Sequence, residues 1–326
     1  MLTFFGPDRN LRRDIRGCSS YFKQNSNRLA VASTRAKRPK AGIRPRILDF
    51  YYATTSAGAA EVLIFVSLPV HSRAGLVNLN AWMSLIVATK SNIEWTEMTW
   101  NPVTGCTKIS QGCKHCYAER MAKRLTAMGS VRYRNGFEVT LHPDLVDVPR
   151  GWRQPRVVFV NSMSDLFHDD IPLAYIQRVF ATMRDCPHHT FQVLTKRSER
   201  LAEFAPYLPW PKNVWMGVSV EDARVVRRVA DLQSTPAAVR FLSLEPLIGP
   251  LDDLPLDGIH WAIVGGESGP KARPMQKQWV SSLLRQCRTA KVPFFFKQWG
   301  GVRKDLTGRA LNGRIYDEMP RGLQMA

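Results

Sequence analysis

From residue 91 onward, short apolar runs alternate with segments whose apolar residues recur at helical spacing. The apolar runs are expected strands, at residues 93–95, 157–160, 191–195, 214–220, 240–244, 261–264 and 294–297. The expected helices between them cover residues 118–128, 173–184, 199–205, 223–233 and 277–290. Several runs are unbroken stretches of β-branched and aromatic residues, which is typical of strands buried on both faces of a sheet.

Strand–helix alternation of this kind predicts an α/β fold, with a parallel sheet and helices on its outside. Six to seven units suit a full or partial β/α barrel of the TIM type. A doubly wound open sheet is the alternative. No GxGxxG motif follows the first expected strand, which weakens a dinucleotide-binding interpretation of that alternative.

Residues 1–82 differ in composition from the rest of the chain, because Lys and Arg far outnumber Asp and Glu and periodic patterns are scarce. One interpretation is a basic, acid-poor targeting segment. The other is an extension that precedes a true start at Met83, and the regular pattern that begins soon after Met83 favours it. We therefore expect a poorly ordered extension, 1–82, and a barrel domain, 83–326.

The formal net charge is +19, and a basic surface favours polyanions such as nucleic acid. No apolar run is long enough for a membrane span, so we expect no membrane partner. Three of the six cysteines are scattered and three are clustered, which favours a metal site in a reducing cytoplasm over a disulfide framework. The oligomeric state is left open by the sequence.

The clustered cysteines are Cys106, Cys113 and Cys116, with the spacing C-x6-C-x2-C. Three thiolates on one tight loop can converge on one metal centre, and Gly105 and Gly112 let the backbone fold back for it. A [4Fe–4S] cluster usually takes four cysteines, so three would leave one iron open to a ligand. Zinc is the rival metal, with His115 as its fourth ligand.

Polar residues follow six consecutive expected strands, where the working residues of β/α barrels lie. They are Asn161, Ser164 and Asp165; Lys196 and Arg197; Glu221 and Asp222; Glu245; Gly265, Gly266 and Glu267; and Lys297 and Gln298. One such residue usually only caps a helix. Six strands that all end this way indicate a site.

The order of strand, cysteine loop, helix and repeated β/α units resembles the radical S-adenosylmethionine (SAM) superfamily. More specifically, the chain resembles a radical-SAM-like family of phage and bacterial proteins that has no assigned reaction. The segments that carry this resemblance are IEWT (93–96), TWNPVTGC (99–106), GC with CYA (112–118), SDLF (164–167), LTKR (194–197), GVSVE (217–221), LEPL (244–247) and GGESG (265–269). The superfamily's usual spacing is C-x3-C-x2-C with an aromatic residue before the last cysteine; here the first gap is six and His115 takes that place.

The resemblance implies a [4Fe–4S] cluster on Cys106, Cys113 and Cys116 and SAM as the second cofactor. With a one-electron reductant, such an enzyme cleaves SAM to a 5′-deoxyadenosyl radical that abstracts hydrogen from a substrate. Lys196 or Arg197 would bind the SAM carboxylate, and Glu245 and Asp165 would accept from its ribose hydroxyls. Gly265 and Gly266, followed by Glu267, would let the backbone approach the cofactor closely.

The substrate is not indicated by the sequence, and the basic charge favours a nucleic acid or a protein over a metabolite. The alternative function is a non-catalytic, phage-related accessory protein that binds nucleic acid and carries zinc or a cluster for structure.

Overall fold

The computed structural model describes residues 49–53, 62–66, 89–91 and 93–320. Within the expected extension it describes two strands, β1 (Asp49–Ala53) and β2 (Val62–Val66), which pair antiparallel. The rest of the expected extension, and with it the expectation of poor order there, lies outside the described residues.

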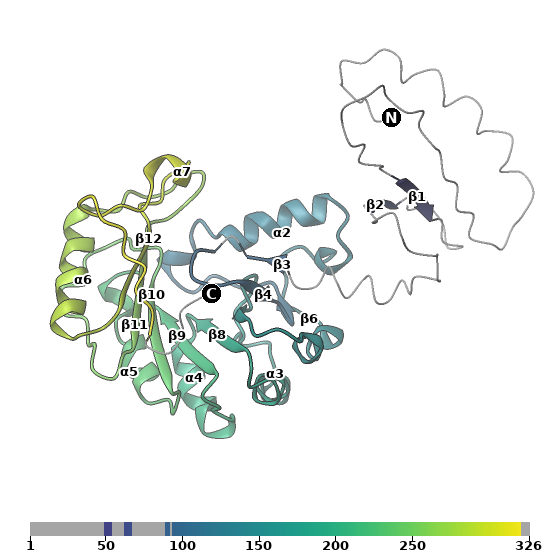
Figure 1. Cartoon of the computed structure of the whole chain (residues 1–326), viewed down its shortest axis with the longest axis horizontal. Coiled ribbons are helices and arrows are strands. Elements are labelled where there is room, and N and C mark those ends of the chain that lie inside the picture. Colours follow the sequence, from purple (N-terminus) through teal and green to yellow (C-terminus); the bar gives the residue numbers. More distant parts are fainter. Residues whose placement is uncertain (1–48, 54–61, 67–88, 92, 321–326) are drawn as a thin grey trace, which may run out of the picture. The chain divides into compact units, whose positions relative to one another are not determined.

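The main sheet contains seven parallel strands that follow one another in chain order. They are β4 (Met98–Trp100), β7 (Val157–Val160), β8 (Thr190–Thr195), β9 (Val214–Ser219), β10 (Val239–Leu244), β11 (Trp261–Gly265) and β12 (Phe294–Gln298). A short β3 (Thr89–Lys90) joins the edge of β4 in antiparallel orientation. The sheet curls without closing, so the expected partial β/α barrel is confirmed as a half-barrel (Figure 1).

The helices that follow β7, β8, β9 and β11 cover the convex side of this sheet (Figure 1). The α-helices of the described residues are α2 (Tyr117–Ala127), α3 (Leu173–Asp185), α4 (Ser198–Phe204), α5 (Arg228–Gln233), α6 (Lys277–Thr289) and α7 (Lys304–Thr307). The 3-10 turns are η3 (Gln111–Cys113), η4 (Val131–Tyr133), η5 (Pro143–Leu145), η6 (Val148–Gly151), η7 (Ala205–Tyr207) and η8 (Ala223–Val225). A small antiparallel pair, β5 (Val103–Thr104) with β6 (Thr140–Leu141), flanks the cysteine loop. In Figure 1, α2 lies apart from α3, α4 and α5, on the other side of the sheet.

Two expected elements were wrong. Residues 93–95 form a turn, closed by a hydrogen bond from the Thr96 amide to the Ile93 carbonyl, and the first parallel strand is β4. Ile93 and Trp95 are apolar because Trp95 is buried against the inner face of the sheet and Ile93 packs on the same cluster. The expected helix 223–233 is a 3-10 turn followed by the shorter α5, because the Asp222 carboxylate accepts from the Arg224 amide and holds a turn there.

The larger core lies between the sheet and the outer helices. Alternate strand residues, such as Val158, Met216, Leu242 and Val264, point into it and are fully buried. They pack against helix residues such as Val179, so α3, α4, α5 and α6 bury the outer face of the sheet. The buried residues of α2, Ala118 and Ala122, belong to a separate small cluster with Met163.

The inner face of the half-barrel changes character along its strands. Its aromatic cluster comprises Trp95, Phe159, Trp215, Phe241, Trp261 and Phe295, together with Ile263. Because side chains alternate between faces, the inward positions further along β7, β9, β10 and β12 are Asn161, Ser219, Ser243 and Lys297, and all four line a cavity. The aromatic cluster thus closes one end of the half-barrel, and the carboxyl ends of the strands present polar groups.

The aromatic cluster predicts a cost for any added atom at Gly217 in β9. A Cβ there would lie 2.5 Å from the Phe241 ring. We expect Gly217→Ala to lower the free energy of unfolding by about 1–3 kcal/mol in urea unfolding, because overpacking strains a filled core. Gly151→Ala is the matched control, since its Cβ would meet no atom within 4 Å. Equal effects of the two substitutions would contradict this account of the inner face.

Candidate functional site

A cavity of about 620 Å³ lies at the carboxyl ends of the parallel strands. Strands β7, β8, β9, β10, β11 and β12, or the residues directly after them, all contribute to its lining. The cysteine loop and the start of α2 form the remaining wall. Five of the six polar strand ends expected from the sequence therefore meet in this lining. The sixth, Glu221 and Asp222, lies just outside it, and β9 contributes Ser219 instead.

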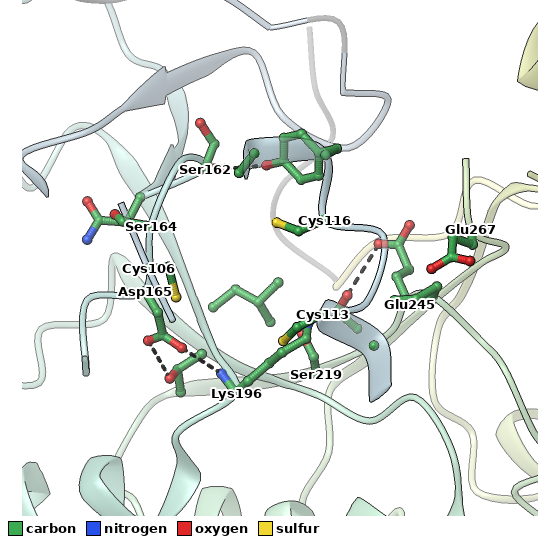
Figure 2. A pocket seen from close by; sticks show the side chains of 18 of the residues that line it. Cys106, Cys113, Cys116, Ser162, Ser164, Asp165, Lys196, Ser219, Glu245 and Glu267 are labelled. Atoms are coloured by element: carbon green, nitrogen blue, oxygen red, sulfur yellow. Dashed lines mark hydrogen bonds between the residues drawn. The ribbon is translucent and has the colours of Figure 1, made fainter. Parts of the chain in front are cut away.

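Cys106, Cys113 and Cys116 line this cavity together, each free and partly exposed. Cys106 follows β5, Cys113 ends the turn η3, and Cys116 is the N-cap of α2. Figure 2 shows the three cysteines around the cavity, with Asp165 and Lys196 toward one side and Glu245 and Glu267 toward the other. Among the described residues, no three His, Cys, Asp or Glu side chains converge closely enough to hold a single metal ion.

Three arginines bind carbonyl oxygens of the cysteine loop. Arg197 donates to the Thr107 carbonyl at 3.2 Å, Arg273 to that of Gln111 at 3.0 Å, and Arg120 to that of His115 at 3.0 Å. These carbonyls lie next to Cys106, two residues before Cys113 and next to Cys116. The loop is therefore fixed beside each thiol by a cation.

Arg197 is the most deeply buried of the three, with its side chain 5% exposed. Its Nη1 lies 3.3 Å from Asp165 Oδ2 and 3.5 Å from Cys106 Sγ. Burial and the charge of Asp165 raise the pKa of the Cys106 thiol to about 11, although Arg197 acts in the opposite direction. Without a metal, this environment keeps Cys106 as a neutral thiol, so metal binding would release its proton.

The Asp165 carboxylate is saturated by protein donors. It accepts from the Thr195 hydroxyl at 2.7 Å and from the backbone amides of Phe167 and Lys196, both at 3.0 Å, besides Arg197. Asp165 therefore holds the ends of β7 and β8 together, and its partner Arg197 connects it to the cysteine loop.

Thr107 extends this network to His168. The Thr107 hydroxyl lies 2.8 Å from His168 Nε2 and accepts from Arg197. The Asp170 amide donates to His168 Nδ1, so the imidazole proton resides on Nε2 and is donated to Thr107. Burial and the neighbouring Arg197 lower the pKa of His168, which keeps the ring neutral.

Glu221 supports the middle of the loop from behind. Its carboxylate, 1% exposed, accepts from the Ser110 hydroxyl at 2.8 Å and from Arg228 at 2.8 Å. Lys196 Nζ lies 3.5 Å from the same carboxylate and reaches the cavity. A Cβ at Gly112 would lie 2.3 Å from Glu221 Oε1, so only glycine lets the loop pass this carboxylate.

Glu245 and Lys297 form an ion pair of 3.0 Å on the cavity wall, and Ser243 donates to Glu245 at 3.3 Å. A Cβ at Gly265 would lie 2.6 Å from Glu245 Oε1, so this glycine leaves room for the carboxylate.

Gly266 and Glu267 line the cavity directly. A Cβ at Gly266 would lie 2.0 Å from the Trp299 carbonyl oxygen, so only glycine lets the backbone after β12 pass this closely. Arg273 donates to both Glu267 oxygens, at 2.9 and 2.6 Å. Burial would raise the pKa of Glu267, but the hydrogen bonds from Arg273 outweigh it and hold this pKa below its usual value.

Several buried polar atoms in the lining have no hydrogen-bond partner among the described residues. They are both amide atoms of Asn161, Ser219 Oγ, Gln298 Oε1 and Trp95 Nε1. Asn161 is 2% exposed and has a left-handed backbone, with φ of 59°. Unpartnered polar atoms are costly in a folded protein, so these side chains are suited to a ligand.

The sequence-predicted residues Cys106, Cys113, Cys116, Asp165, Lys196, Arg197, Glu245, Gly266 and Glu267 all line the cavity, and Gly265 lies just behind Glu245. Arg120, Arg273 and Arg228 were missed. Arg120 stands on α2 and Arg273 in a loop, and only the fold brings them to the cysteine loop. Asn161 and Gln298 were noted as strand ends, but their unpartnered amides are visible only in the structure.

The family model described as "Protein of unknown function (DUF5131)" matches residues 90–320. No protein with a curated function matches the chain.

Among solved structures, a spore photoproduct lyase mutant with bound AdoMet and dinucleoside spore photoproduct is similar, at 11% identity and a TM-score of 0.37. A spore photoproduct lyase complexed with dinucleoside spore photoproduct is 12% identical, at a TM-score of 0.38. Each match covers 61% of this chain and 63% of the solved chain.

The arginine contacts predict how firmly the loop is held. Arg120 binds the carbonyls of His115 and Ser268, and it has no carboxylate partner among the described residues. Arg120→Met removes both contacts while keeping helix propensity and length. We expect trypsin to cut after Lys114 several-fold faster in this variant, because the loop opens more often. Arg124→Met, on the exposed face of the same helix, is the control; the same acceleration there would refute the anchoring role.

Proposed function

We propose that this chain, which belongs to the DUF5131 family, is a radical-SAM-like enzyme with a [4Fe–4S] cluster and SAM in the cavity at its strand ends. One observation carries the proposal. Three free thiols of a C-x6-C-x2-C loop line a cavity together with the polar ends of six parallel strands. The sequence resemblance to radical SAM proteins gives that arrangement its chemistry. The proposed setting is the cytoplasm, where a one-electron reductant is at hand.

The residues fit a cluster in donor chemistry and in charge. Thiolates are the ligands that iron–sulfur clusters take. A cluster gives each thiolate its own iron, so the three sulfurs need not converge on one point, as a single zinc ion would require. The three arginines that bind the carbonyl oxygens of the loop would offset the negative charge of a thiolate-bound cluster. When bound, the cluster and SAM supply reductive cleavage of SAM to methionine and a 5′-deoxyadenosyl radical.

The contacts sharpen the roles of the candidate SAM ligands. Lys196 reaches the cavity with one weak ion pair, so it is the better partner for the SAM carboxylate. Arg197 is committed to Asp165 and the cysteine loop. Glu245 is the better acceptor for the ribose hydroxyls, because Asp165 already accepts four hydrogen bonds. Gly266 lines the cavity, so its backbone would lie against the cofactor.

Anaerobic reconstitution with iron and sulfide tests the metal centre. We expect a brown protein with about four irons per chain, and loss of the colour in Cys106→Ala. Cys186→Ala is the control, because Cys186 is buried in the outer core and lies outside the cavity lining. A colourless protein that holds one zinc per chain would refute the cluster and support the zinc alternative.

Incubation with SAM and a strong reductant tests catalysis. We expect 5′-deoxyadenosine as a product, detected by chromatography. Lys196→Met should raise the KM for SAM by about 10-fold or more, the usual loss when a charged hydrogen bond is removed. Lys212→Met, just before the amino end of β9 and away from the cavity, should leave this KM unchanged. An intact cluster with no 5′-deoxyadenosine would show that the cluster is structural.

A further inference from the structure

We propose that the exposed face of α2 beside the cavity binds a single-stranded nucleic acid and that one base of the strand enters the cavity. This names the substrate class of the site, and it rests on the proposed function only in placing that base next to the reactive centre. The surface itself is argued from exposure, charge and unpartnered side chains.

The exposed face of α2 is an apolar and basic stripe. Tyr117, Met121, Arg124 and Met128 follow one another at spacings of four, three and four residues, so they lie on one side of the helix. Tyr117 is 50% exposed, Met121 43% and Met128 69%. Tyr117 and Met121 also line the cavity, so the stripe leads directly into it.

Basic residues dominate the segment from 114 to 134. It contains Lys114, Arg120, Lys123, Arg124, Arg132 and Arg134, against Glu119 alone among acidic residues. Lys123 pairs with Glu119, and Arg132 pairs with Asp144. Lys114, Arg124 and Arg134 are exposed and have no carboxylate within ion-pair distance in the part of the chain that the structure describes. A phosphate backbone supplies the charge that these cations lack.

The interior of the cavity is suited to a base rather than to a phosphate. Asn161 offers an unused donor and an unused acceptor, and Gln298 and Ser219 add further unpartnered oxygens. Amide side chains read the edges of bases, and unstacked bases bind against aromatic rings such as Tyr117 at the mouth. Each nucleotide brings both a phosphate for the stripe and a base for the cavity.

Fluorescence anisotropy with a labelled, mixed-sequence oligonucleotide, as single-stranded DNA or RNA, tests the stripe and the exposed cations that flank it on the full-length protein. In the triple variant Lys114→Glu, Arg124→Glu, Arg134→Glu we expect binding at least about 10-fold weaker and a salt dependence shallower by about two. The control is Arg153→Glu, Arg156→Glu, Lys212→Glu. It makes the same charge change on exposed residues that precede β7 and β9, at the amino ends of these strands and away from the cavity. We expect it to weaken binding less than about threefold.

Equal weakening in the two triple variants would overturn the proposal, because only net charge would then matter. A dimer that Met121→Glu dissociates, with oligonucleotide binding unchanged, would also overturn it and assign the stripe to a second copy of this chain. Tighter binding of DNA or of RNA identifies the type of nucleic acid that the protein prefers, and either result supports the proposal.

Single-base probes test the entry of a base. We expect the protein to rank oligo-A, oligo-C and oligo-T probes differently, and Asn161→Asp to change that ranking without changing the salt dependence. Asn312→Asp is the control, because Asn312 is exposed and shares the left-handed backbone, with φ of 53°. No ranking in the wild type, or an unchanged ranking in Asn161→Asp, would overturn base entry.

The two hypotheses fail separately, because no SAM or reductant enters these binding assays. A protein that holds no cluster but binds the strand through α2 would refute the proposed function alone. A protein with a cluster that ignores the strand would refute this inference alone.

Discussion

The buried ion pair between Asp165 and Arg197 is the contact on which the site depends. Asp165 joins the ends of β7 and β8 through its hydrogen bonds to Thr195 and Lys196. Arg197, paired with Asp165, also contacts Cys106 and the Thr107 carbonyl in the cysteine loop. Breaking a buried pair by removing one partner typically costs about 3–5 kcal/mol, since the other charge is left unpaired. Removing Asp165 or Arg197 would therefore affect both the ends of the strands and the position of the cysteine loop.

The inner face of the half-barrel explains why the chemistry lies at one end. Aromatic side chains fill the half-barrel where the strands begin, and Trp261 contacts four other aromatic rings there. Toward the carboxyl ends, the inward positions are occupied by polar residues such as Asn161, Ser243 and Lys297. These polar groups therefore lie on top of the buried aromatic cluster. In such surroundings, hydrogen bonds and ion pairs act more strongly than they would in water.

The sequence predicted most of the parallel strands because they are unbroken apolar runs, and burial on both faces leaves that mark. The prediction was wrong at residues 93–95, because Trp95 belongs to the inner aromatic cluster and does not lie in a strand. The cysteines, Lys196 and Glu245 were predictable from spacing and from their place at strand ends. Arg120 and Arg273 were not, because their partners are backbone carbonyls, which carry no signature in sequence. The unused hydrogen-bonding capacity of Asn161 is likewise a property of its surroundings.

The position of Cys116 at the N-cap of α2 has an electrical consequence. The peptide dipoles of an α-helix add up to about half a positive charge at its N-terminus, and no side chain caps this one. That partial charge would stabilise an anionic group bound beside Cys116, which lines the cavity. It would also favour the more negative, reduced form of any cluster bound there, and so shift the reduction potential upward. Under the two proposals, α2 would raise the reduction potential of a cluster at its N-terminus and bind the nucleic acid along its exposed side.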